Sequence, residues 1–194
     1  NLKCLSVHIG SQIFENKPYE KMLKVIDKII SETKFEFKYI DLGGGMGIPY
    51  QNEKKEFNYK SYQKSIIRFL GKYNSKLIFE PGRSIIGNTG ILISKIIYIK
   101  ESQSKNFIIL DVGMNDLMRP ALYRAKHRII PVIKTKKYSN ITYEFVGPIC
   151  ESSDKFLSVK KFQKLKEKEL VIICDVGAYG SSLSSNYNLR SKPA

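Results

Sequence analysis

The apolar run 37–40 is followed by Asp41-Leu42-Gly43-Gly44-Gly45-Met46-Gly47, a stretch with four glycines in five positions. The run itself is typical of the end of a buried strand. Glycine carries no Cβ, so the backbone N–H groups of this loop can converge on an anion. A glycine loop at the carboxyl end of a strand often holds a phosphate. A tight turn that needs positive φ explains the same glycines and stays open as the alternative.

The dinucleotide-binding fingerprint is the main rival for this loop. That motif reads Gly-x-Gly-x-x-Gly or Ala and opens directly into a helix. Counting from Gly43 puts Gly45 in the second position, but Ile48 stands in the third and Pro49 follows. The next residues, 50–58, are polar and irregular rather than helical. We therefore reject a Rossmann site and favour a phosphate-bearing cofactor held by a barrel loop.

The first 85 residues alternate between strand and helix patterns. We expect a buried strand at 2–8, further strands at 37–40 and 77–79, and helices at 18–32 and 59–73. This rhythm predicts parallel α/β structure, and polar or glycine residues follow each strand, as they do at the catalytic face of a (β/α)8 barrel. Three such units cannot close a barrel, so residues 1–85 are predicted to form part of one.

The residue pattern changes after Arg83, where β-branched residues become frequent. We expect extended segments at 85–100, 107–112, 128–134, 141–146 and 170–175, with short helical turns only near 115–123 and 159–165. The predicted fold class is therefore α/β plus β. A partial (β/α)8 barrel, residues 1–85, precedes a mainly antiparallel β domain, residues 86–194.

Composition narrows the functional classes. The net charge of +15 suggests the hypothesis of nucleic-acid binding. The lysines are scattered, however, and no RNA-binding signature appears, so no nucleic-acid partner is expected. No apolar run approaches the roughly 20 residues of a membrane span, so no membrane contact is expected. The three cysteines lack metal-ligand spacing, which predicts no metal site and favours the cytoplasm. The start has no signal-type leader, and both ends predict a fragment of a longer chain.

Six motifs occur in order along the chain. They are His8-Ile9-Gly10-Ser11-Gln12, the stretch 41–50, Glu80-Pro81-Gly82-Arg83, the segment 115–123 with Arg119-Pro120-Ala121-Leu122-Tyr123, the segment 147–154, and the segment 175–188. Together they resemble the C-terminal portion of the fold-type III decarboxylases that use pyridoxal 5′-phosphate (PLP), and among these the bacterial diaminopimelate decarboxylase family. Related ornithine decarboxylases carry Cys-Asp where this chain has Cys150-Glu151.

The resemblance implies PLP as the cofactor and the C-terminal part of a PLP-binding barrel as the fold of residues 1–85. Glu80 matches the carboxylate that keeps the ring nitrogen protonated, and a negative charge at that place stabilises the positive one. His8 matches the residue that stacks on the ring. The phosphate is expected to be held by the amides of Gly43, Gly44 and Gly45 and by the hydroxyls of Ser11 and Tyr179.

The implied reaction is the decarboxylation of meso-2,6-diaminopimelate at its D-centre to L-lysine, the last step of lysine biosynthesis. The distal end of this substrate carries a carboxylate and an ammonium. Arg83 and Arg119 match the carboxylate-binding arginines, and a planar guanidinium suits bidentate binding. Glu151 matches the residue that faces the distal ammonium. Further contacts with the substrate are expected from Tyr123 and Ser152.

Cys150 matches the residue that protonates the reacting carbon after carbon dioxide has left. A general acid must lie close to the atom that it protonates. An isolated cysteine is more often a buried structural residue. Within this motif we favour the catalytic role.

The resemblance also implies a homodimer with shared active sites, in which Cys150 and Glu151 of one chain meet His8, the glycine loop and Glu80 of the other. The family's PLP lysine lies in an earlier Tyr-Ala-x-Lys-Ala-like motif, which this chain does not contain. The chain alone is therefore expected to be inactive and poorly folded. Two alternatives stay open: a fold-type III decarboxylase acting on ornithine or carboxynorspermidine, against which Glu151 and Arg119 argue, and a non-catalytic relative.

Overall fold

The computed structural model describes residues 2–51 and 55–193. The chain divides into two compact units. We call the first the strand–helix unit; it comprises the described residues of 2–49 and 55–85. The second, the sheet unit, comprises Tyr50, Gln51 and residues 86–193.

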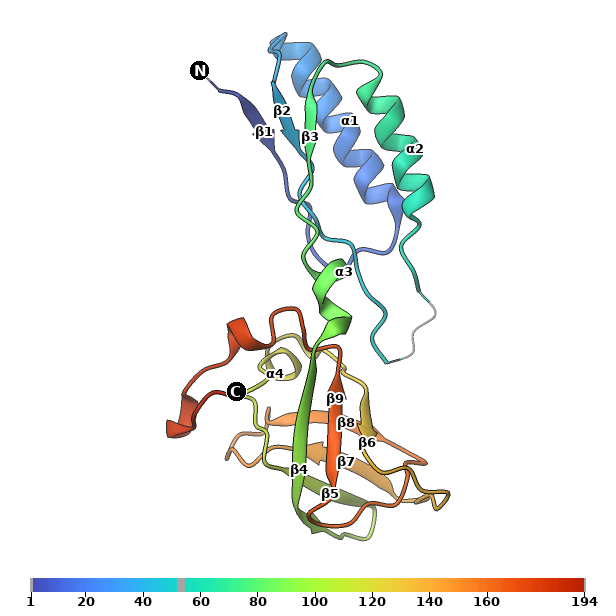
Figure 1. Ribbon diagram of the computed structural model, residues 1–194, viewed down its shortest axis with the longest axis vertical. Helices are drawn as coiled ribbons and strands as arrows, with labels where there is room; N and C mark the ends of the chain where they lie inside the picture. The colour runs from blue at the N-terminus through green and yellow to red at the C-terminus, as the bar shows by residue number, and fades with distance from the viewer. Residues whose placement is uncertain (1, 52–54, 194) are drawn as a thin grey trace. The chain divides into compact units, whose positions relative to one another are not determined.

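The strand–helix unit is built on a three-stranded parallel sheet. Its strands β1 (Cys4–Ser6), β2 (Tyr39–Asp41) and β3 (Lys76–Ile78) are neighbours in sequence order, and α1 (Asn16–Thr33) and α2 (Tyr59–Leu70) connect them. Both helices lie along the same side of the strands (Figure 1). Their apolar faces pack on the sheet around Tyr19, Ile26 and Ile40, which are almost completely buried. The predicted parallel α/β structure is confirmed.

The strands of this unit are less buried than the sequence pattern suggests. Residues 2–8 are predicted as a buried strand, yet Leu2 is 73% exposed and Cys4 is exposed. Phe79, directly after β3, is also exposed. β1 and β3 are the two edges of a three-stranded sheet, so each has a neighbour on one side only. Full burial of parallel strands needs neighbours at both edges and cover on both faces, and the expectation of a buried strand at 2–8 is therefore wrong for this chain.

The sheet unit contains six strands in the order β6-β9-β4-β5-β7-β8. They are β4 (Ile91–Lys100), β5 (Lys105–Leu110), β6 (Ile129–Pro131), β7 (Thr142–Val146), β8 (Lys155–Val159) and β9 (Leu170–Cys174). The pairs are antiparallel apart from β5 and β7, which run parallel. The first half of β4 pairs with β9 and the second half with β5, so this long strand joins the two halves of the curled sheet. The predicted mainly antiparallel β structure is confirmed.

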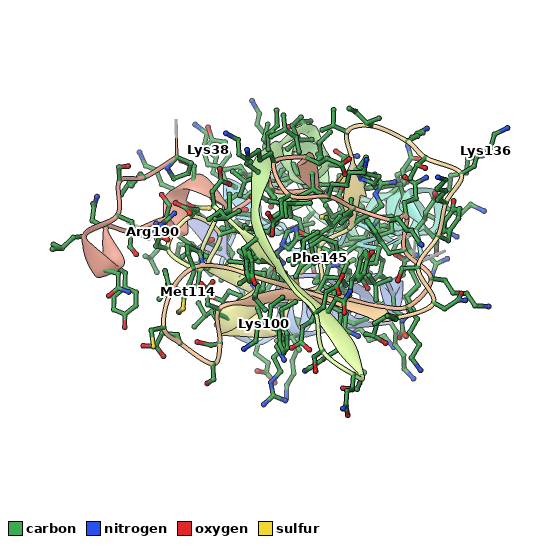
Figure 2. The ribbon with its side chains drawn as sticks, turned by 90° about the horizontal axis from the view of Figure 1, so that it is seen from below. Lys38, Lys100, Met114, Lys136, Phe145 and Arg190 are labelled. Carbon is green, nitrogen blue, oxygen red and sulfur yellow. The ribbon has the colours of Figure 1, made fainter. Side chains whose placement is uncertain are left out.

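The core of the sheet unit lies between the halves of this sheet. Ile96, Ile108, Phe145 and Ile173 are completely buried there. Figure 2 shows Phe145 among packed side chains and the exposed Lys136 at the outside. The short helix α4 (Arg119–Tyr123) and the 3-10 turns η2 (Ser181–Leu183) and η3 (Tyr187–Leu189) lie outside the sheet. Among the described residues, no helix is long and apolar enough to cross a membrane.

Two local predictions are wrong. The extended segment predicted from residue 85 begins only at 91, because α3 (Arg83–Ile86) and the 3-10 turn η1 (Gly87–Thr89) come first. In this turn, the backbone oxygens of Gly87 and Gly90 accept hydrogen bonds from the amides of residues 177 and 176. The two segments approach so closely that a Cβ on Gly177 would lie 1.9 Å from the Ile86 oxygen. The helical turn predicted at 159–165 is irregular chain instead, hydrogen-bonded to residues 137–139. β8 was not expected.

Glu144 on β7 is a buried carboxylate between two lysines. It accepts hydrogen bonds from Lys105 on β5 and Lys155 on β8, the strands on either side, and is 4% exposed. Burial raises the pKa of Glu144, but the two lysine hydrogen bonds more than offset burial, so its pKa lies below the ordinary value. A carboxyl with a depressed pKa stabilises the fold at neutral pH, and this stabilisation is lost as the pH falls through its folded-state pKa.

We expect Glu144→Gln to lower the free energy of unfolding by about 1–2 kcal/mol at neutral pH, because an amide cannot balance the two half-exposed lysines. At an acidic pH below the depressed folded-state pKa of Glu144, the wild-type carboxyl is itself neutral, so the difference should shrink. Urea unfolding of both proteins at the two pH values measures this. Glu101→Gln, at an exposed position, is the control and should change little. An equal loss for Glu144→Gln at both pH values would contradict the ion-pair account.

Candidate active site

In the strand–helix unit, three of the sequence motifs lie at one edge of the parallel sheet. His8 and Ser11 follow β1, the glycine loop follows β2, and Glu80 follows β3. The strands are aligned in register, so these three strand ends are neighbours. A backbone hydrogen bond also joins two of these strand ends, because the Glu80 amide donates to the Gly43 oxygen at 2.8 Å. The structure thus brings together the loops to which the sequence assigns the cofactor.

The glycine loop lies tightly against its neighbours. A Cβ on Gly43 would lie 2.5 Å from the Val7 oxygen and 3.2 Å from His8 Nδ1. A Cβ on Gly44 would lie 2.1 Å from the Glu80 oxygen. Gly43 and Gly45 also have positive φ, 62° and 95°. Close approach and backbone conformation therefore require these glycines, as the tight-turn alternative supposes.

Two buried side chains fix the peptide planes of this loop. The Asp41 carboxylate accepts hydrogen bonds from Ser6 Oγ at 3.1 Å and from the Gly43 amide at 2.8 Å. The Tyr19 hydroxyl donates to the Gly44 oxygen at 3.0 Å. Burial raises the pKa of Tyr19 to about 12, so this hydroxyl remains a donor at neutral pH.

These contacts change which amides an anion can use. The Gly43 N–H, one of three amides predicted to hold a phosphate, already donates to Asp41. Within the described part of the chain, the N–H groups of Gly44 and Gly45 donate to no acceptor. Gly44 is buried, and a buried N–H without a partner is costly. Two adjacent amides are thus left for an external anion.

The other predicted residues of this unit are more exposed. His8, Ser11 and Glu80 are exposed. Arg83 donates from NH2 to Ser11 Oγ at 3.2 Å. A residue predicted to bind the substrate carboxylate therefore contacts one predicted to bind the phosphate, which places a cation beside the expected anion site.

In the sheet unit, Asp154 joins two of the motifs. Its carboxylate accepts hydrogen bonds from the amides of Met114 and Ile149, both at 2.7 Å. Met114 precedes α4, and Ile149 precedes Cys150. Burial raises the pKa of Asp154, and the two amide hydrogen bonds offset part of that rise. Asp154 thereby fixes the start of the Cys150-Glu151 loop to the loop that precedes α4.

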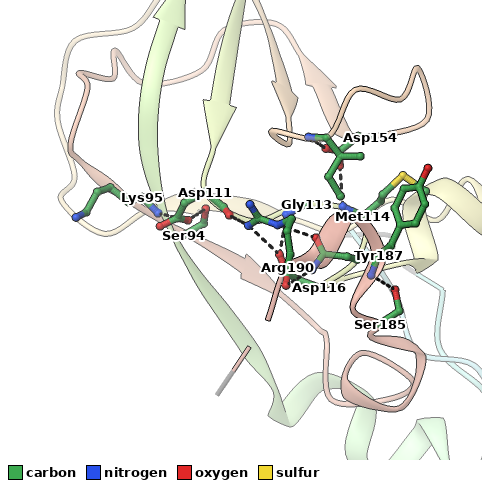
Figure 3. Close-up of polar contacts among 12 residues, drawn as sticks. Ser94, Lys95, Asp111, Gly113, Met114, Asp116, Asp154, Ser185, Tyr187 and Arg190 are labelled. Carbon is green, nitrogen blue, oxygen red and sulfur yellow. Dashed lines mark hydrogen bonds and ion pairs between the residues drawn. The ribbon is translucent and has the colours of Figure 1, made fainter. Parts of the chain in front are cut away.

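A second network fixes the segment that follows β9 (Figure 3). Arg190 donates from Nε to Asn115 Oδ1 at 3.0 Å and lies 3.7 Å from Asp116. The Tyr187 hydroxyl donates to Glu151 Oε1 at 2.6 Å, and this bond raises the pKa of Tyr187. The 175–190 segment is therefore hydrogen-bonded to both other motifs of the unit.

The remaining predicted residues lie on the surface of this network. Cys150, Glu151 and Tyr123 are exposed, and Tyr179 is 48% exposed with a φ of 62°. Ser152 lines a pocket of about 590 Å³, whose charged lining residues are Arg124, Lys126 and Lys155. Three cations suit an anion rather than an ammonium.

Arg119, by contrast, is buried at the start of α4 and only 5% exposed. Its guanidinium lies 4.7 Å from the ring centroid of Tyr50. Its NH1 lies 2.8 Å from His127 Nε2, and His127 Nδ1 lies 2.9 Å from the Cys174 oxygen. The structure thus holds Arg119 in one orientation, through a histidine to which the sequence assigned no role.

Comparison with known proteins places these motifs in a family. Residues 16–177 match the family model described as the pyridoxal-dependent decarboxylase, C-terminal sheet domain. The chain belongs to the pyridoxal-dependent decarboxylase family. Diaminopimelate decarboxylase of Aquifex aeolicus is 42% identical, and that of Neisseria meningitidis serogroup B is 40% identical; each match covers 100% of this chain and 47% of the relative. The chain therefore spans about half the length of the curated relatives that it matches.

Solved structures of the family give the same result. The diaminopimelate decarboxylase of M. jannaschii has a TM-score of 0.87 at 38% identity over 96% of this chain and 44% of its own. The Helicobacter pylori enzyme complexed with L-lysine has a TM-score of 0.85 at 38% identity over 97% of this chain and 47% of its own. A Vibrio vulnificus lysine/ornithine decarboxylase, at 21% identity and a TM-score of 0.84, shares the fold. The resemblance to the PLP-dependent decarboxylases is confirmed.

The residues of this pyridoxal-dependent decarboxylase chain fit the cofactor that the family implies. A phosphate monoester needs several N–H or O–H donors. Among the described residues, the amides of Gly44 and Gly45 donate to no acceptor, and Gly45 approaches Gly10, the neighbour of Ser11, whose hydroxyl Arg83 contacts. A pyridinium nitrogen needs a carboxylate, and Glu80 follows the neighbouring strand. Among the described residues, no three His, Cys, Asp or Glu side chains group as a metal site.

Sequence reasoning missed the residues that hold these candidate-site loops in place. They are Tyr19, Asp41, His127, Asp154, Tyr187 and Arg190. Asp154 and Tyr187 lie inside quoted motifs, so their segments were found but not their partners. His127 and Arg190 follow the ends of motifs by a few residues, and nothing in their spacing predicts which atoms they contact.

Proposed function

We propose that the complete protein containing this chain is a PLP-dependent decarboxylase that converts meso-2,6-diaminopimelate to L-lysine and carbon dioxide. One observation carries the proposal. The loop that precedes the Arg119 helix, the Cys150-Glu151 loop and the 175–190 segment are hydrogen-bonded to one another in a single unit. Relatives named diaminopimelate decarboxylase, about 40% identical over the whole chain, support the choice of substrate.

The strand–helix unit supplies the cofactor-binding groups in this proposal apart from Tyr179, which belongs to the sheet unit. PLP, when bound, supplies an electron sink for the carbon from which carbon dioxide departs. The amides of Gly44 and Gly45 and the hydroxyls of Ser11 and Tyr179 donate to its phosphate. Glu80 keeps the ring nitrogen protonated, because a carboxylate beside it stabilises the positive charge. His8 packs against the face of the ring.

The sheet unit supplies the substrate-binding groups apart from Arg83, which belongs to the strand–helix unit. The distal carboxylate is bound by Arg119, together with Arg83 and the Tyr123 hydroxyl, and charge-assisted hydrogen bonds make this contact strong. Glu151 binds the distal ammonium. The Tyr187 hydroxyl donates to Glu151 Oε1 and so fixes the direction of that carboxylate. This pair of opposite charges selects a substrate whose far end is itself an amino acid.

Cys150 carries the proton of the reaction. One C–C bond breaks and carbon dioxide leaves; one C–H bond forms in its place, so the conversion of diaminopimelate to lysine consumes one proton and is not a redox reaction. The Cys150 thiol delivers that proton to the reacting carbon. The bond from Asp154 to the Ile149 amide fixes the backbone next to this thiol.

A homodimer is part of the proposal. Cys150 and Glu151 of one chain act with the glycine loop, His8 and Glu80 of the other, so neither chain alone has a complete site. Its location in the cytoplasm follows from the biosynthetic role and agrees with three cysteines that form no disulfide.

The test is an assay of the complete purified protein, supplied with PLP and meso-2,6-diaminopimelate. We expect L-lysine and carbon dioxide in equal amounts, with no activity when PLP has been removed by dialysis. A protein that binds PLP but releases no lysine would contradict the proposed substrate. Decarboxylation of ornithine or carboxynorspermidine instead would point to the other branch of the family.

A further inference from the structure

We infer that His127 is a positioning residue for the substrate carboxylate: it fixes the guanidinium of Arg119 through a neutral imidazole of one defined tautomer. The inference rests on the proposed function, because it assigns Arg119 to the substrate. It goes beyond that function because it names the residue that sets the orientation of Arg119.

The hydrogen-bond partners fix the tautomer of His127. Its ring is completely buried. Nδ1 lies 2.9 Å from the Cys174 backbone oxygen, and a carbonyl oxygen only accepts, so Nδ1 carries the hydrogen. Nε2 lies 2.8 Å from Arg119 NH1, and a guanidinium only donates, so Nε2 presents its lone pair. A doubly protonated ring would set an N–H and a second positive charge against the arginine.

Two contacts together define the plane of the Arg119 guanidinium. His127 fixes NH1 from one side. The Tyr50 ring lies under the guanidinium, with 4.7 Å between the guanidinium carbon and the ring centroid. His127 meets the same Tyr50 ring edge-on, at 5.2 Å and 72°. Because the guanidinium is planar, fixing one nitrogen and one face sets the direction of every N–H that it carries.

The anchor of His127 is itself rigid. Cys174 is the last residue of β9, and its amide donates to the Arg128 oxygen at 2.9 Å. β6, which begins two residues after His127, pairs with β9, with Ile129 opposite Ile173. The histidine therefore links Arg119 to the strand that leads into the Tyr179 segment, and Arg119 and Tyr179 depend on the same strand end.

Two substitutions of His127 distinguish the roles of its two ring nitrogens. The Gln side chain in His127→Gln can place an acceptor where Nε2 lies, whereas the shorter amide of His127→Asn reaches only the place of Nδ1. Both keep a polar side chain of smaller or similar size. Lys126→Gln, at the exposed neighbouring position, is the control for changes in this stretch of chain.

The experiment measures kcat and KM for meso-diaminopimelate, bound PLP and the unfolding temperature of the complete holoenzyme. We expect His127→Asn to raise KM about tenfold, since one charge-assisted hydrogen bond is lost, with kcat changed less than about threefold and PLP binding unchanged. His127→Gln should restore most of KM. In an Arg119→Ala background, His127→Asn should add less than about twofold.

The outcomes separate the inference from the proposed function. No lysine from the wild-type enzyme would refute the proposed function. With an active wild type, an unchanged KM in His127→Asn would overturn the inference. An equal rise of KM in the Asn and Gln variants would also overturn the inference. So would a rise of KM on His127→Asn that is as large in the Arg119→Ala background as in the wild type, because a histidine that only supports the fold acts regardless of Arg119. A His127→Asn variant that does not fold leaves the Gln variant to decide, in which a raised KM would contradict the inference.

Discussion

Replacing Cys150 by alanine is expected to lower kcat for lysine formation about 100- to 1,000-fold in the complete enzyme, because the variant loses the group that protonates the reacting carbon. KM should change little, since the thiol is assigned no part in binding the distal end of the substrate. Bound PLP should also be unchanged, because the cofactor-binding groups lie in other loops. Steady-state kinetics with the absorbance spectrum of the bound cofactor measure all three quantities.

Cys4→Ala is the matched control for this prediction. Cys4 is an exposed cysteine on β1 to which no role is assigned. Its replacement should leave kcat within about twofold of wild type. If Cys150→Ala kept more than a tenth of the wild-type kcat, the proton would have to come from another group.

Replacing Gly44 by alanine is expected to weaken PLP binding about 100-fold or more. The new Cβ would lie 2.1 Å from the Glu80 oxygen, and the closest atoms are backbone, which cannot rotate away. The loop must therefore move, and with it the amides of Gly44 and Gly45 and the Glu80 side chain. The dissociation constant of PLP for the apoenzyme, measured by equilibrium dialysis, reports the effect.

Gly71→Ala is the control for the glycine prediction. Gly71 follows α2 with a φ of −58°, and a Cβ there would meet nothing closer than 3.6 Å. This variant should bind PLP as wild type does. Wild-type affinity in Gly44→Ala would show that the glycine loop does not position the cofactor.

The sequence predicted the location of the strand–helix motifs because their signal is local. Apolar runs mark β2 and β3, helical spacing marks α1 and α2, and polar residues follow each strand. Parallel strands in sequence order place those ends at one edge, so the approach of His8, the glycine loop and Glu80 could be expected. The hydrogen bond from the Gly43 amide to Asp41 could not be expected, because the sequence indicated Asp41 only as the first residue of the loop.

The sheet unit was harder to predict because its contacts join residues distant in sequence. The parallel pairing of β5 and β7 brings the loops after these strands together, and no local pattern reveals it. Asp154 reaches back 40 residues to Met114, and Arg190 reaches back 75 residues to Asn115. Motif resemblance proposed roles for Arg119, Cys150 and Glu151, which stay predictions, whereas the side chains that contact these segments could be identified only from the structure.

The most direct test of the central claim compares two substrates on one enzyme. The claim is that Arg119 and Glu151 bind a distal carboxylate and ammonium together, and L-ornithine has no distal carboxylate. The measurement is the ratio of kcat/KM for meso-2,6-diaminopimelate to that for L-ornithine, with the complete protein saturated with PLP. We predict a ratio of about 1,000 or more, because ornithine leaves the buried arginine without its anion. A ratio near one, or a preference for ornithine, would contradict the account.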